Sequence, residues 1–335
     1  MTPIRVAQVG LGPIGLAVTR QLAGRSGFDL IGAVDIAPDI QGDDLGTLCG
    51  LDDTLGVAVE PDLGEALKRL EPDIVVACTS SSLEAVATTL ETCVGGGASV
   101  VSSTEQLAYP WRERPEISKR LHQAALEAEK TILGTGVNPG FAMDVLPLTL
   151  TAPCRRVDAV SVRRFQNAAK RRGPFQRKIG AGLTPAAFRE RVEQGTLGHV
   201  GFAESIGMIA ETLGWRLDRI TDEIQPKIAE QAVASDVLDV EPGQVSGLIQ
   251  LGVGYEGTRE RIRLELQAYL GAPEDFDEVE IQGDPNLRSR VEGGFPGDIA
   301  TASVLVNAIP RVVAAPPGLL TMKDLPPVYC WPGRG

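Results

Sequence analysis

The sequence predicts an α/β fold: an N-terminal doubly wound parallel sheet, followed by a second α+β domain with a mainly antiparallel sheet. Three observations predict it. The 335 residues exceed what one hydrophobic core usually serves. Strand-like and helix-like segments alternate through the first half of the chain, which implies crossovers and parallel strands. After Asn138-Pro139-Gly140, strand-like segments follow one another without intervening helices.

The elements of the first half follow from hydrophobic pattern and turn residues. The predicted strands are Ile4–Val9, Phe28–Val34, Val57–Val59, Ile74–Ala77, Ser99–Val101 and Ile132–Leu133. The predicted helices between them are Ile14–Ala23, Leu63–Leu70, Leu83–Cys93 and Glu116–Glu129.

The second half mixes both kinds of element. Its predicted helices are Ala186–Gln194 and Phe202–Leu213, and its predicted strands are Val157–Arg164, Val245–Tyr255, Arg259–Tyr269, Val279–Ile281 and Leu287–Val291. A helical pattern returns over Asp298–Ala314, and we expect it to pack back on the first domain. The expected domains are 1–142 for dinucleotide binding, 143–296 for substrate binding and dimerisation, and 297–335 as the returning segment.

Composition narrows the class of protein. A net charge of −12 argues against nucleic acid and against an anionic membrane surface as partners. The first residues lack the pattern of a secretory signal, and the apolar runs are too short to span a bilayer. The five cysteines are scattered without metal-ligand spacing, which favours reduced thiols in a cytoplasmic protein and no metal site.

A glycine-rich turn joins the first predicted strand to the first predicted helix. It reads Gly10-Leu11-Gly12-Pro13-Ile14-Gly15. In such a turn the first glycine makes the tight bend, the second lets a pyrophosphate approach, and the third lets helix and strand pack closely. The helix N-terminus then offers N–H groups to the phosphates. The position predicts a Rossmann dinucleotide site, and a purely structural turn is the alternative.

Asp35 strengthens this interpretation. It ends the second predicted strand, 20 residues beyond Gly15, where a carboxylate takes the ribose hydroxyls. A carboxylate repels a 2′-phosphate, so NAD(H) is favoured and NADP(H) remains possible. Thr79, Ser80 and Ser81 follow another strand at its carboxyl end. We expect them near the nicotinamide ribose, with capping of the next helix as the equal alternative.

Glu105 is the candidate catalytic residue. It follows the strand Ser99–Val101, at the edge of the sheet where ligands bind. The next residues include Leu107, Tyr109 and Trp111, and a carboxylate beside such an apolar wall would suit proton transfer. A helix-capping or solvated glutamate is the alternative.

Further candidates lie at the domain junction and in the second domain. Asn138, in a rigid turn, is assigned to both cofactor and substrate. The substrate pocket is completed by Pro139, Phe141, Phe165, Asn167 and His199. A structural role for His199 is the competing interpretation, and His122 is expected to be a solvated surface residue. The segment 163–178 carries seven cations; we favour a loop near the cofactor or a subunit interface over a nucleic-acid patch or a plain solvated loop.

These segments together resemble the 2,4-diaminopentanoate dehydrogenase and native amine dehydrogenase family, relatives of dihydrodipicolinate reductase. The resemblance rests on the glycine turn, Ser103-Thr104-Glu105, Gly134-x-Gly-x-Asn138-Pro139-Gly140-Phe141, Asn167-Ala168-Ala169-Lys170-Arg171-Arg172, Gly198-His199-Val200-Gly201 and Gly293-Gly294-Phe295-Pro296-Gly297-Asp298-Ile299-Ala300-Thr301. It covers roughly Ile4 to Pro327. The His-His pair and Lys-x-Asp-x-Pro-Ser-Gly-Thr segment typical of dihydrodipicolinate reductases are replaced here.

The resemblance implies reversible reductive amination of a ketone or aldehyde with ammonia, using NADH or NADPH, in a homodimer. The family's catalytic glutamate matches Glu105. A simple carbonyl compound is preferred over a 2-oxo acid, because the sequence shows no convincing clamp for an α-carboxylate. Two alternatives stay open: a related diamino-acid dehydrogenase or cyclic-imine reductase, and a nonenzymatic dinucleotide-binding sensor.

Overall fold

The computed structural model describes residues 2–332, which form two compact units. Unit 1 contains the chain up to Phe141 together with the chain from Pro296 onward, and unit 2 contains Ala142–Phe295. The chain therefore passes between the units at two places. The segment expected to return to the first domain is part of unit 1.

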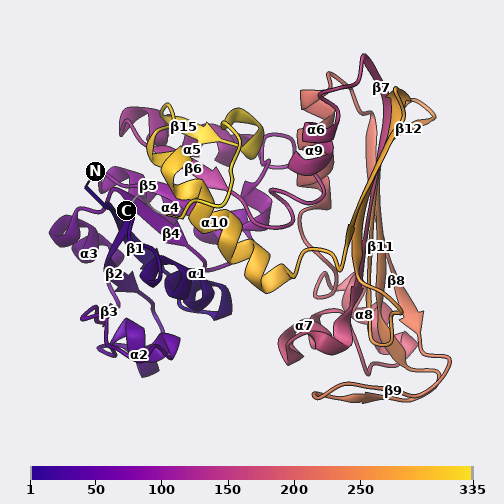
Figure 1. The fold of residues 1–335 in the computed structure, drawn as a ribbon, viewed down its shortest axis with the longest axis horizontal. Helices are drawn as coiled ribbons and strands as arrows, with labels where there is room; N and C mark the ends of the chain where they lie inside the picture. Colours follow the sequence, from indigo (N-terminus) through magenta and orange to yellow (C-terminus); the bar gives the residue numbers. More distant parts are fainter. Residues whose placement is uncertain (1, 333–335) are drawn as a thin grey trace. The chain divides into compact units, whose positions relative to one another are not determined.

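Unit 1 is built on a parallel sheet (Figure 1). Within residues 2–332 its seven strands lie in the order β15-β6-β5-β4-β1-β2-β3, and every pairing between them is parallel. The strands are β1 (Ile4–Val9), β2 (Phe28–Val34), β3 (Val59–Glu60), β4 (Ile74–Ala77), β5 (Ser99–Ser102), β6 (Thr131–Gly134) and β15 (Gly318–Leu320). The parallel sheet predicted from alternating strands and helices is confirmed. The short β15 was not predicted.

Helices cover both faces of this sheet. Helices α1 (Pro13–Ala23) and α10 (Gly297–Val313) pack together, with Gln21 donating to the Ser303 hydroxyl at 3.0 Å and Arg25 to the Asn307 oxygen at 2.7 Å. The apolar residues of α3 (Leu63–Leu70), α4 (Leu83–Gly95) and α5 (Pro115–Glu127) pack on the other face. The short α2 (Leu45–Cys49) was not predicted.

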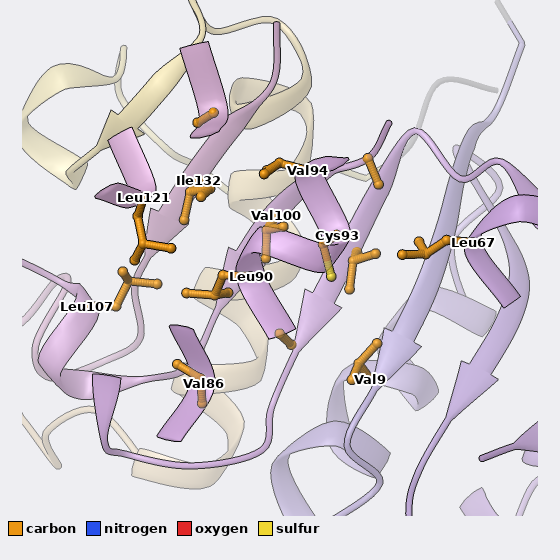
Figure 2. Packing of buried hydrophobic residues seen from close by; sticks show 14 of the residues in the cluster. Val9, Leu67, Val86, Leu90, Cys93, Val94, Val100, Leu107, Leu121 and Ile132 are labelled. Carbon is orange, nitrogen blue, oxygen red and sulfur yellow. The ribbon is translucent and has the colours of Figure 1, made fainter. Parts of the chain in front are cut away.

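The core under α3, α4 and α5 fixes the turn after β5. Figure 2 shows Leu107, from this turn, among Leu90, Leu121 and Ile132. All four side chains are fully buried. Burial of a leucine side chain contributes roughly 1.5–3 kcal/mol, so Leu107 anchors the turn to the unit's interior.

Unit 2 contains a mixed sheet. For the described residues the strand order is β14-β13-β7-β12-β11-β8, antiparallel throughout except for the parallel pair β7 and β12. The strands are β7 (Arg156–Asn167), β8 (Arg219–Ile228), β11 (Val245–Glu256), β12 (Arg259–Tyr269), β13 (Phe276–Asp284) and β14 (Leu287–Glu292), with β9 (Val233–Ala234) and β10 (Asp239–Val240) forming a separate pair. Strand β8 was not predicted, because its charges and Pro226 are typical of non-strand sequence. At the sheet edge both are tolerated.

Helices of unit 2 lie on one side of this sheet (Figure 1). They are α6 (Val145–Leu150), α7 (Gly173–Lys178), α8 (Pro185–Glu193) and α9 (Phe202–Thr212). Helix α9 lies close to β11 because the strand carries glycine beneath it: a Cβ on Gly252 would come within 2.7 Å of Phe202, and one on Gly254 within 2.9 Å of Ile206. The apolar face of β11 and β12 is thus covered by α9 of the same chain.

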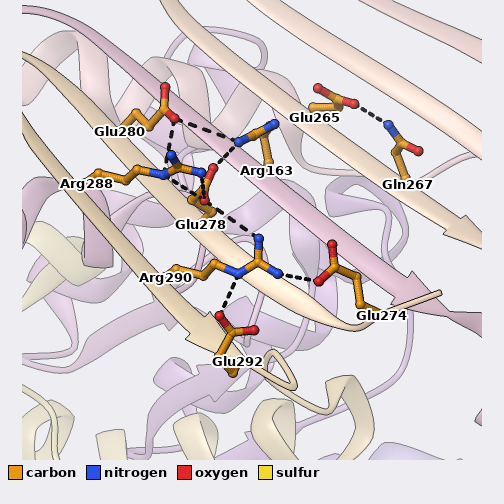
Figure 3. A network of polar contacts seen from close by, with 9 residues as sticks. All are labelled: Arg163, Glu265, Gln267, Glu274, Glu278, Glu280, Arg288, Arg290 and Glu292. Carbon is orange, nitrogen blue, oxygen red and sulfur yellow. Dashed lines mark hydrogen bonds and ion pairs between the residues drawn. The ribbon is translucent and has the colours of Figure 1, made fainter. Parts of the chain in front are cut away.

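The opposite face of the sheet carries ion pairs (Figure 3). The Glu278 carboxylate, whose side chain is 0% exposed, is held by Arg163 and by Arg288, whose Nη2 lies 2.6 Å from its Oε2. Arg290 stacks on the Phe276 ring, 3.8 Å from its centroid, and pairs with Glu292. Burial alone would raise the pKa of Glu278, but hydrogen bonds from Arg288 and Arg163 hold it below its ordinary value.

The basic segment 163–178 is not one loop. Arg163 and Arg164 belong to β7, the segment continues through a 3₁₀ turn at Ala168–Lys170, and it ends in α7. Arg164 is buried and its Nε lies 2.6 Å from Asp277 Oδ1, so this cation stabilises the interior of unit 2. Arg163 and Arg164 therefore lie in a strand and not in the expected loop.

The Glu278 cluster predicts a pH-dependent stability difference. A carboxyl pKa held below 4.5 in the folded state stabilises the protein above pH 4.5, and this contribution is lost as the pH falls through the lowered value. We expect Glu278→Gln to lower the free energy of unfolding at pH 7, and the deficit relative to the parent to shrink below about pH 4.5.

Urea denaturation between pH 3 and pH 7 measures this deficit. Glu292→Gln is the matched control, because the Glu292 side chain is 76% exposed and its ion pair is solvated. A Glu278→Gln deficit of equal size at pH 3 and pH 7 would contradict the role of the ionised carboxylate.

Candidate active site

The turns that follow the strands of unit 1 lie along one edge of its sheet. Because β2, β1, β4, β5 and β6 are neighbours and run parallel, their carboxyl ends meet there. From β2 toward β6, this edge carries Asp35, the glycine turn, Thr79–Ser82, Glu105 and Asn138. It is the edge where ligands bind in open α/β sheets.

The glycines of the first turn have distinct steric roles. Gly10 has φ +82°, and a Cβ there would lie 2.5 Å from the carbonyl oxygen of Cys78. A Cβ on Gly15 would lie 1.9 Å from the carbonyl oxygen of Gly10, so only glycine lets α1 start this close to β1. A Cβ on Gly12 would meet no atom within 4 Å. Gly12 is the N-cap of α1 and Pro13 its first residue, so open space adjoins the first N–H groups of the helix.

Asp35 is tied to the glycine turn. One carboxylate oxygen accepts a hydrogen bond from the Leu11 N–H at 2.6 Å, and the other accepts from the Ala37 N–H at 2.9 Å. The side chain is half-buried, while the next residue, Ile36, is 85% exposed. The carboxylate is therefore held in place beside an exposed apolar side chain, with lone pairs left for a further donor.

Thr79, Ser80 and Ser81 do not cap the helix that follows β4. Ser82 is the N-cap of α4 and accepts from the Ala85 N–H. Ser80 accepts from the Ser82 N–H at 3.2 Å, and the carbonyl groups of Ser80 and Ser81 receive hydrogen bonds from the turn after β5. Thr79 is exposed. The capping alternative for Thr79, Ser80 and Ser81 is thus excluded by the position of the cap.

Glu105 begins a short 3₁₀ turn, Glu105–Leu107, between two residues that are fixed to the turn after β4. The Thr104 hydroxyl donates to the Ser80 carbonyl at 2.8 Å. Gln106 accepts from the Leu83 N–H at 2.9 Å and donates its own N–H to the Ser81 carbonyl at 3.3 Å. Glu105 is half-buried at the sheet edge. Its backbone is fixed because the residues before and after it, Thr104 and Gln106, are both hydrogen-bonded to the turn after β4.

The apolar neighbours of Glu105 lie elsewhere than expected. Leu107 is inside the core, and Trp111 packs against the same core and against the His122 ring, at 5.6 Å between centroids. A Cβ on Gly134 would lie 2.5 Å from the backbone of Leu107, so the end of β6 contacts this turn directly. Leu107 and Trp111 thus support the turn from inside the core. The prediction that they form an apolar wall beside the Glu105 carboxylate is wrong.

The segment after β6 is buried and contacts α10. Residues 135–140 are all buried, and the Asn138-Pro139 peptide bond is cis. The Val137 N–H donates to the Thr301 hydroxyl at 3.5 Å, and Gly136 approaches the same side chain. Phe141 is half-buried and ends the first of the two chain segments that form unit 1. Asn138 and Pro139 therefore lie at the same sheet edge as Glu105.

The proposed pocket residues of unit 2 are not brought together. Phe165 stacks on Phe276 at 4.6 Å between centroids, on the face with the ion pairs. Asn167 caps the following 3₁₀ turn: its side chain accepts from the Ala169 N–H at 3.0 Å and donates to the Ala272 carbonyl at 3.0 Å. These contacts are structural, and the register places Phe165 and Gln250 on opposite faces of the sheet.

His199 lies on the face covered by α9. Its backbone N–H donates to Gln250 at 2.7 Å, and its ring lies edge-on to Phe202, 5.8 Å between centroids. His199 is half-buried. One chain therefore does not place Phe165 and His199 in a single pocket.

His122 is a structural residue rather than a solvated one. Its Nδ1 accepts a hydrogen bond from the Leu319 N–H at 3.1 Å, which links α5 to β15. Across residues 2–332 the structure contains no group of three or more His, Cys, Asp or Glu side chains able to hold a metal ion. Nor does any helix of that range have the length and apolar character to cross a membrane.

Sequence reasoning missed three side chains that shape this edge: Thr104, Gln106 and Thr301. The first two flank Glu105 and could have been found by asking what holds a polar turn beside a buried strand. Thr301 comes from α10, far along the chain, and its contact with Val137 depends on how that helix packs.

Cys78 directly follows β4. Burial raises the pKa of its thiol to about 11, so this cysteine is not a thiolate.

Comparison with known proteins shows the family of the chain. The family described as 2,4-diaminopentanoate dehydrogenase C-terminal domain matches residues 141–334. A 2,4-diaminopentanoate dehydrogenase from Acetoanaerobium sticklandii is 32% identical, over 97% of this chain and 94% of that protein. An amine dehydrogenase from Streptomyces virginiae is 25% identical, over 95% of this chain and 94% of that protein.

A solved structure is similar over the whole chain as well. The amine dehydrogenase from Mycobacterium smegmatis superimposes with a TM-score of 0.87 at 29% identity, covering 99% of this chain and 98% of that one. The chain therefore belongs to the 2,4-diaminopentanoate dehydrogenase family, and it is an oxidoreductase that acts on CH–NH2 donors.

Proposed function

We propose that this protein is an amine dehydrogenase that interconverts a ketone or aldehyde and the corresponding amine, with NADH as the preferred reductant. The observation that carries the proposal is the position of Glu105: a carboxylate at the carboxyl edge of the parallel sheet, on a turn fixed by Thr104 and Gln106. Membership of the family supports the reaction class.

The glycine turn and its surroundings fit a dinucleotide. The space over Gly12 admits a pyrophosphate beside the first N–H groups of α1. Asp35 offers carboxylate oxygens to ribose hydroxyls, and the exposed Ile36 suits the flat apolar face of an adenine. When bound, a reduced nicotinamide supplies the hydride that completes the reaction.

Glu105 is proposed to move protons in the steps before hydride transfer. The ammonia nitrogen forms a bond to the carbonyl carbon, and Glu105 takes a proton from that nitrogen. Glu105 gives this proton to the former carbonyl oxygen, which makes a carbinolamine. Glu105 then takes a second proton from solvent and passes it to the carbinolamine hydroxyl, which leaves as water, so that an iminium cation remains on the substrate and Glu105 is again a carboxylate. The ionised carboxylate stabilises this cation, because an unpaired charge in a water-poor site is costly.

The substrate is proposed to be a simple carbonyl compound, with a diamino acid as the second candidate. The second candidate is favoured by the relative from Acetoanaerobium sticklandii, whose name specifies 2,4-diaminopentanoate. Ammonia-dependent oxidation of NADH with a panel of ketones and aldehydes tests the first. NAD⁺ reduction by 2,4-diaminopentanoate tests the second. Absence of turnover in both assays, with either cofactor, would contradict the proposed function.

We further propose a cytoplasmic homodimer formed through unit 2. The face of its sheet opposite α9 carries ion pairs and the half-buried side chains of Ile249, Leu251 and Tyr255, a mixture typical of surfaces that a symmetric partner covers. The scattered positions of the five cysteines support a reducing compartment.

Removing the charge of Asp35 should change cofactor preference. We expect NADH to bind at least as well as NADPH in the parent, and Asp35→Asn to improve NADPH binding relative to NADH by about tenfold, since a carboxylate repels a 2′-phosphate. The asparagine retains one oxygen acceptor for the backbone, whereas Asp35→Ala loses both contacts. Titration of each cofactor measures the ratio. The exposed Asp39→Asn is the control, and strong NADPH selectivity in the parent would remove Asp35 from this role.

Glu105→Gln should reduce the amination rate by roughly 10²–10⁴, the usual contribution of a positioned acid or base. NADH affinity should remain at the parent value, because the glycine turn is unchanged. Steady-state turnover and NADH fluorescence titration separate the two effects. The exposed Glu127→Gln serves as control. Turnover within a few-fold of the parent would show that Glu105 is not the acid/base.

Sedimentation equilibrium at micromolar concentration should give twice the mass of one chain. Leu251→Glu places a charge among the apolar side chains on the sheet face opposite α9. It should shift the equilibrium toward monomer, because the dimer would bury this charge without a partner of opposite charge. The control Leu126→Glu changes an exposed residue of unit 1. A parent that sediments only as monomer would contradict the dimer.

A further inference from the structure

The peptide group between Gly10 and Leu11, in the glycine turn, is held at both ends. Its carbonyl oxygen accepts a hydrogen bond from Gln8 Nε2 at 3.0 Å, and its N–H donates to the Asp35 carboxylate at 2.6 Å. The N–H of Gly10 itself donates to the Val34 carbonyl at 2.9 Å. One peptide group of the turn therefore connects a side chain of β1 to the carboxylate assigned to the cofactor ribose.

Gln8 is a polar residue inside unit 1. Its side chain is 0% exposed, so bulk water does not replace its hydrogen bonds. Nε2 also donates to the Val9 carbonyl at 3.3 Å. A flipped amide would turn Oε1 toward two carbonyl oxygens, so these two acceptors specify one orientation. A Cβ on Gly15 would lie 3.0 Å from Nε2, which places the amide against the first turn of α1.

The turn needs this hold because its first residue is a glycine. Gly10 has φ +82° and no Cβ, so its backbone has more rotational freedom than that of other residue types. An apolar side chain at position 8 would leave the Gly10 carbonyl without the Nε2 donor. Rotation of the peptide group would then turn the Leu11 N–H away from Asp35. The carboxylate would keep its contact with the Ala37 N–H at 2.9 Å and lose the one to the glycine turn.

We propose that Gln8 is a positioning residue for Asp35, acting through the Gly10–Leu11 peptide group, and that it thereby strengthens the discrimination between NADH and NADPH. The part that concerns the two cofactors rests on the proposed function, whereas the coupling of Gln8 to the Leu11 N–H does not. Gln8 is buried behind the turn and touches no cofactor atom in this assignment. It acts by fixing the carboxylate that meets the ribose hydroxyls and repels a 2′-phosphate.

The first test uses the protein without cofactor. Amide hydrogen exchange, followed by NMR, compares the Leu11 N–H with that of Val76 in the middle of β4, which reports general loss of stability. We expect Gln8→Met, which keeps the side-chain volume and removes the donor, to speed Leu11 exchange about fivefold to tenfold more than Val76 exchange. Gln21→Met is the matched control, because it removes an amide of α1 that bonds to Ser303 instead. Equal changes at Leu11 and Val76 in Gln8→Met would overturn the coupling.

Titration of both cofactors forms the second test. We expect Gln8→Met to weaken NADH binding more than NADPH binding, so that the ratio of the two dissociation constants moves about twofold to tenfold in favour of NADPH. A general loss of stability would weaken both equally and leave the ratio unchanged, and Gln21→Met should also leave it unchanged. In an Asp35→Asn background, Gln8→Met should no longer move the ratio. An unmoved ratio in the parent background, or a full shift in the Asp35→Asn background, would show that Gln8 does not act through Asp35.

Two further outcomes are distinguishable. Should Gln8→Met fail to fold, Gln8→Asn keeps an amide but withdraws the donor from the Gly10 carbonyl by the length of one methylene group, and it carries the same measurements. A parent that binds neither cofactor would contradict the proposed function, while the exchange of the Leu11 N–H would still decide whether Gln8 holds the peptide group.

Discussion

Strands β2, β1, β4, β5 and β6 run in one direction, so each turn that follows one of them lies at the same edge of the sheet. This single constraint gathers residues as far apart in sequence as Asp35 and Asn138. It also leaves their backbones without strand partners, and each turn needs another source of hydrogen bonds. Asp35 supplies them to the glycine turn, and Thr104 with Gln106 joins the turns after β4 and β5.

Much of unit 1 could be predicted from sequence because its signals are local. The glycine turn, the strand before it and Asp35 after the next strand lie within one short stretch, and their steric roles follow from the absence of a Cβ. The candidate Glu105 was found in the same way, from its place after a strand. The sequence could not show where the side chains that follow Glu105 point. Leu107 points into the core, and this depends on the close contact between Gly134, at the end of β6, and the backbone of Leu107.

Unit 2 was harder to predict because its pairings are not local. Strand β7 lies between β12 and β13, which come about a hundred residues later, and its side chains alternate between two very different faces. Arg164 and Phe165 are adjacent in sequence, yet one is buried against Asp277 and the other stacks on Phe276 under Arg290. A sequence pattern shows the alternation but not which face a helix covers, so Phe165 and His199 were assigned to one pocket.

In each unit the side-chain amide of a glutamine holds the backbone at or beside a candidate site residue. Gln106 fixes the turn of Glu105 by accepting from the Leu83 N–H. Gln250 holds the backbone of His199 by accepting from its N–H and donating to its carbonyl. An amide suits this task because it carries donors and an acceptor without a charge, so it needs no counterion when buried. A carboxylate or an ammonium group in place of the Gln106 amide would change the electrostatic field at Glu105. Gln106 therefore holds the turn of Glu105 without adding a charge of its own beside that carboxyl group.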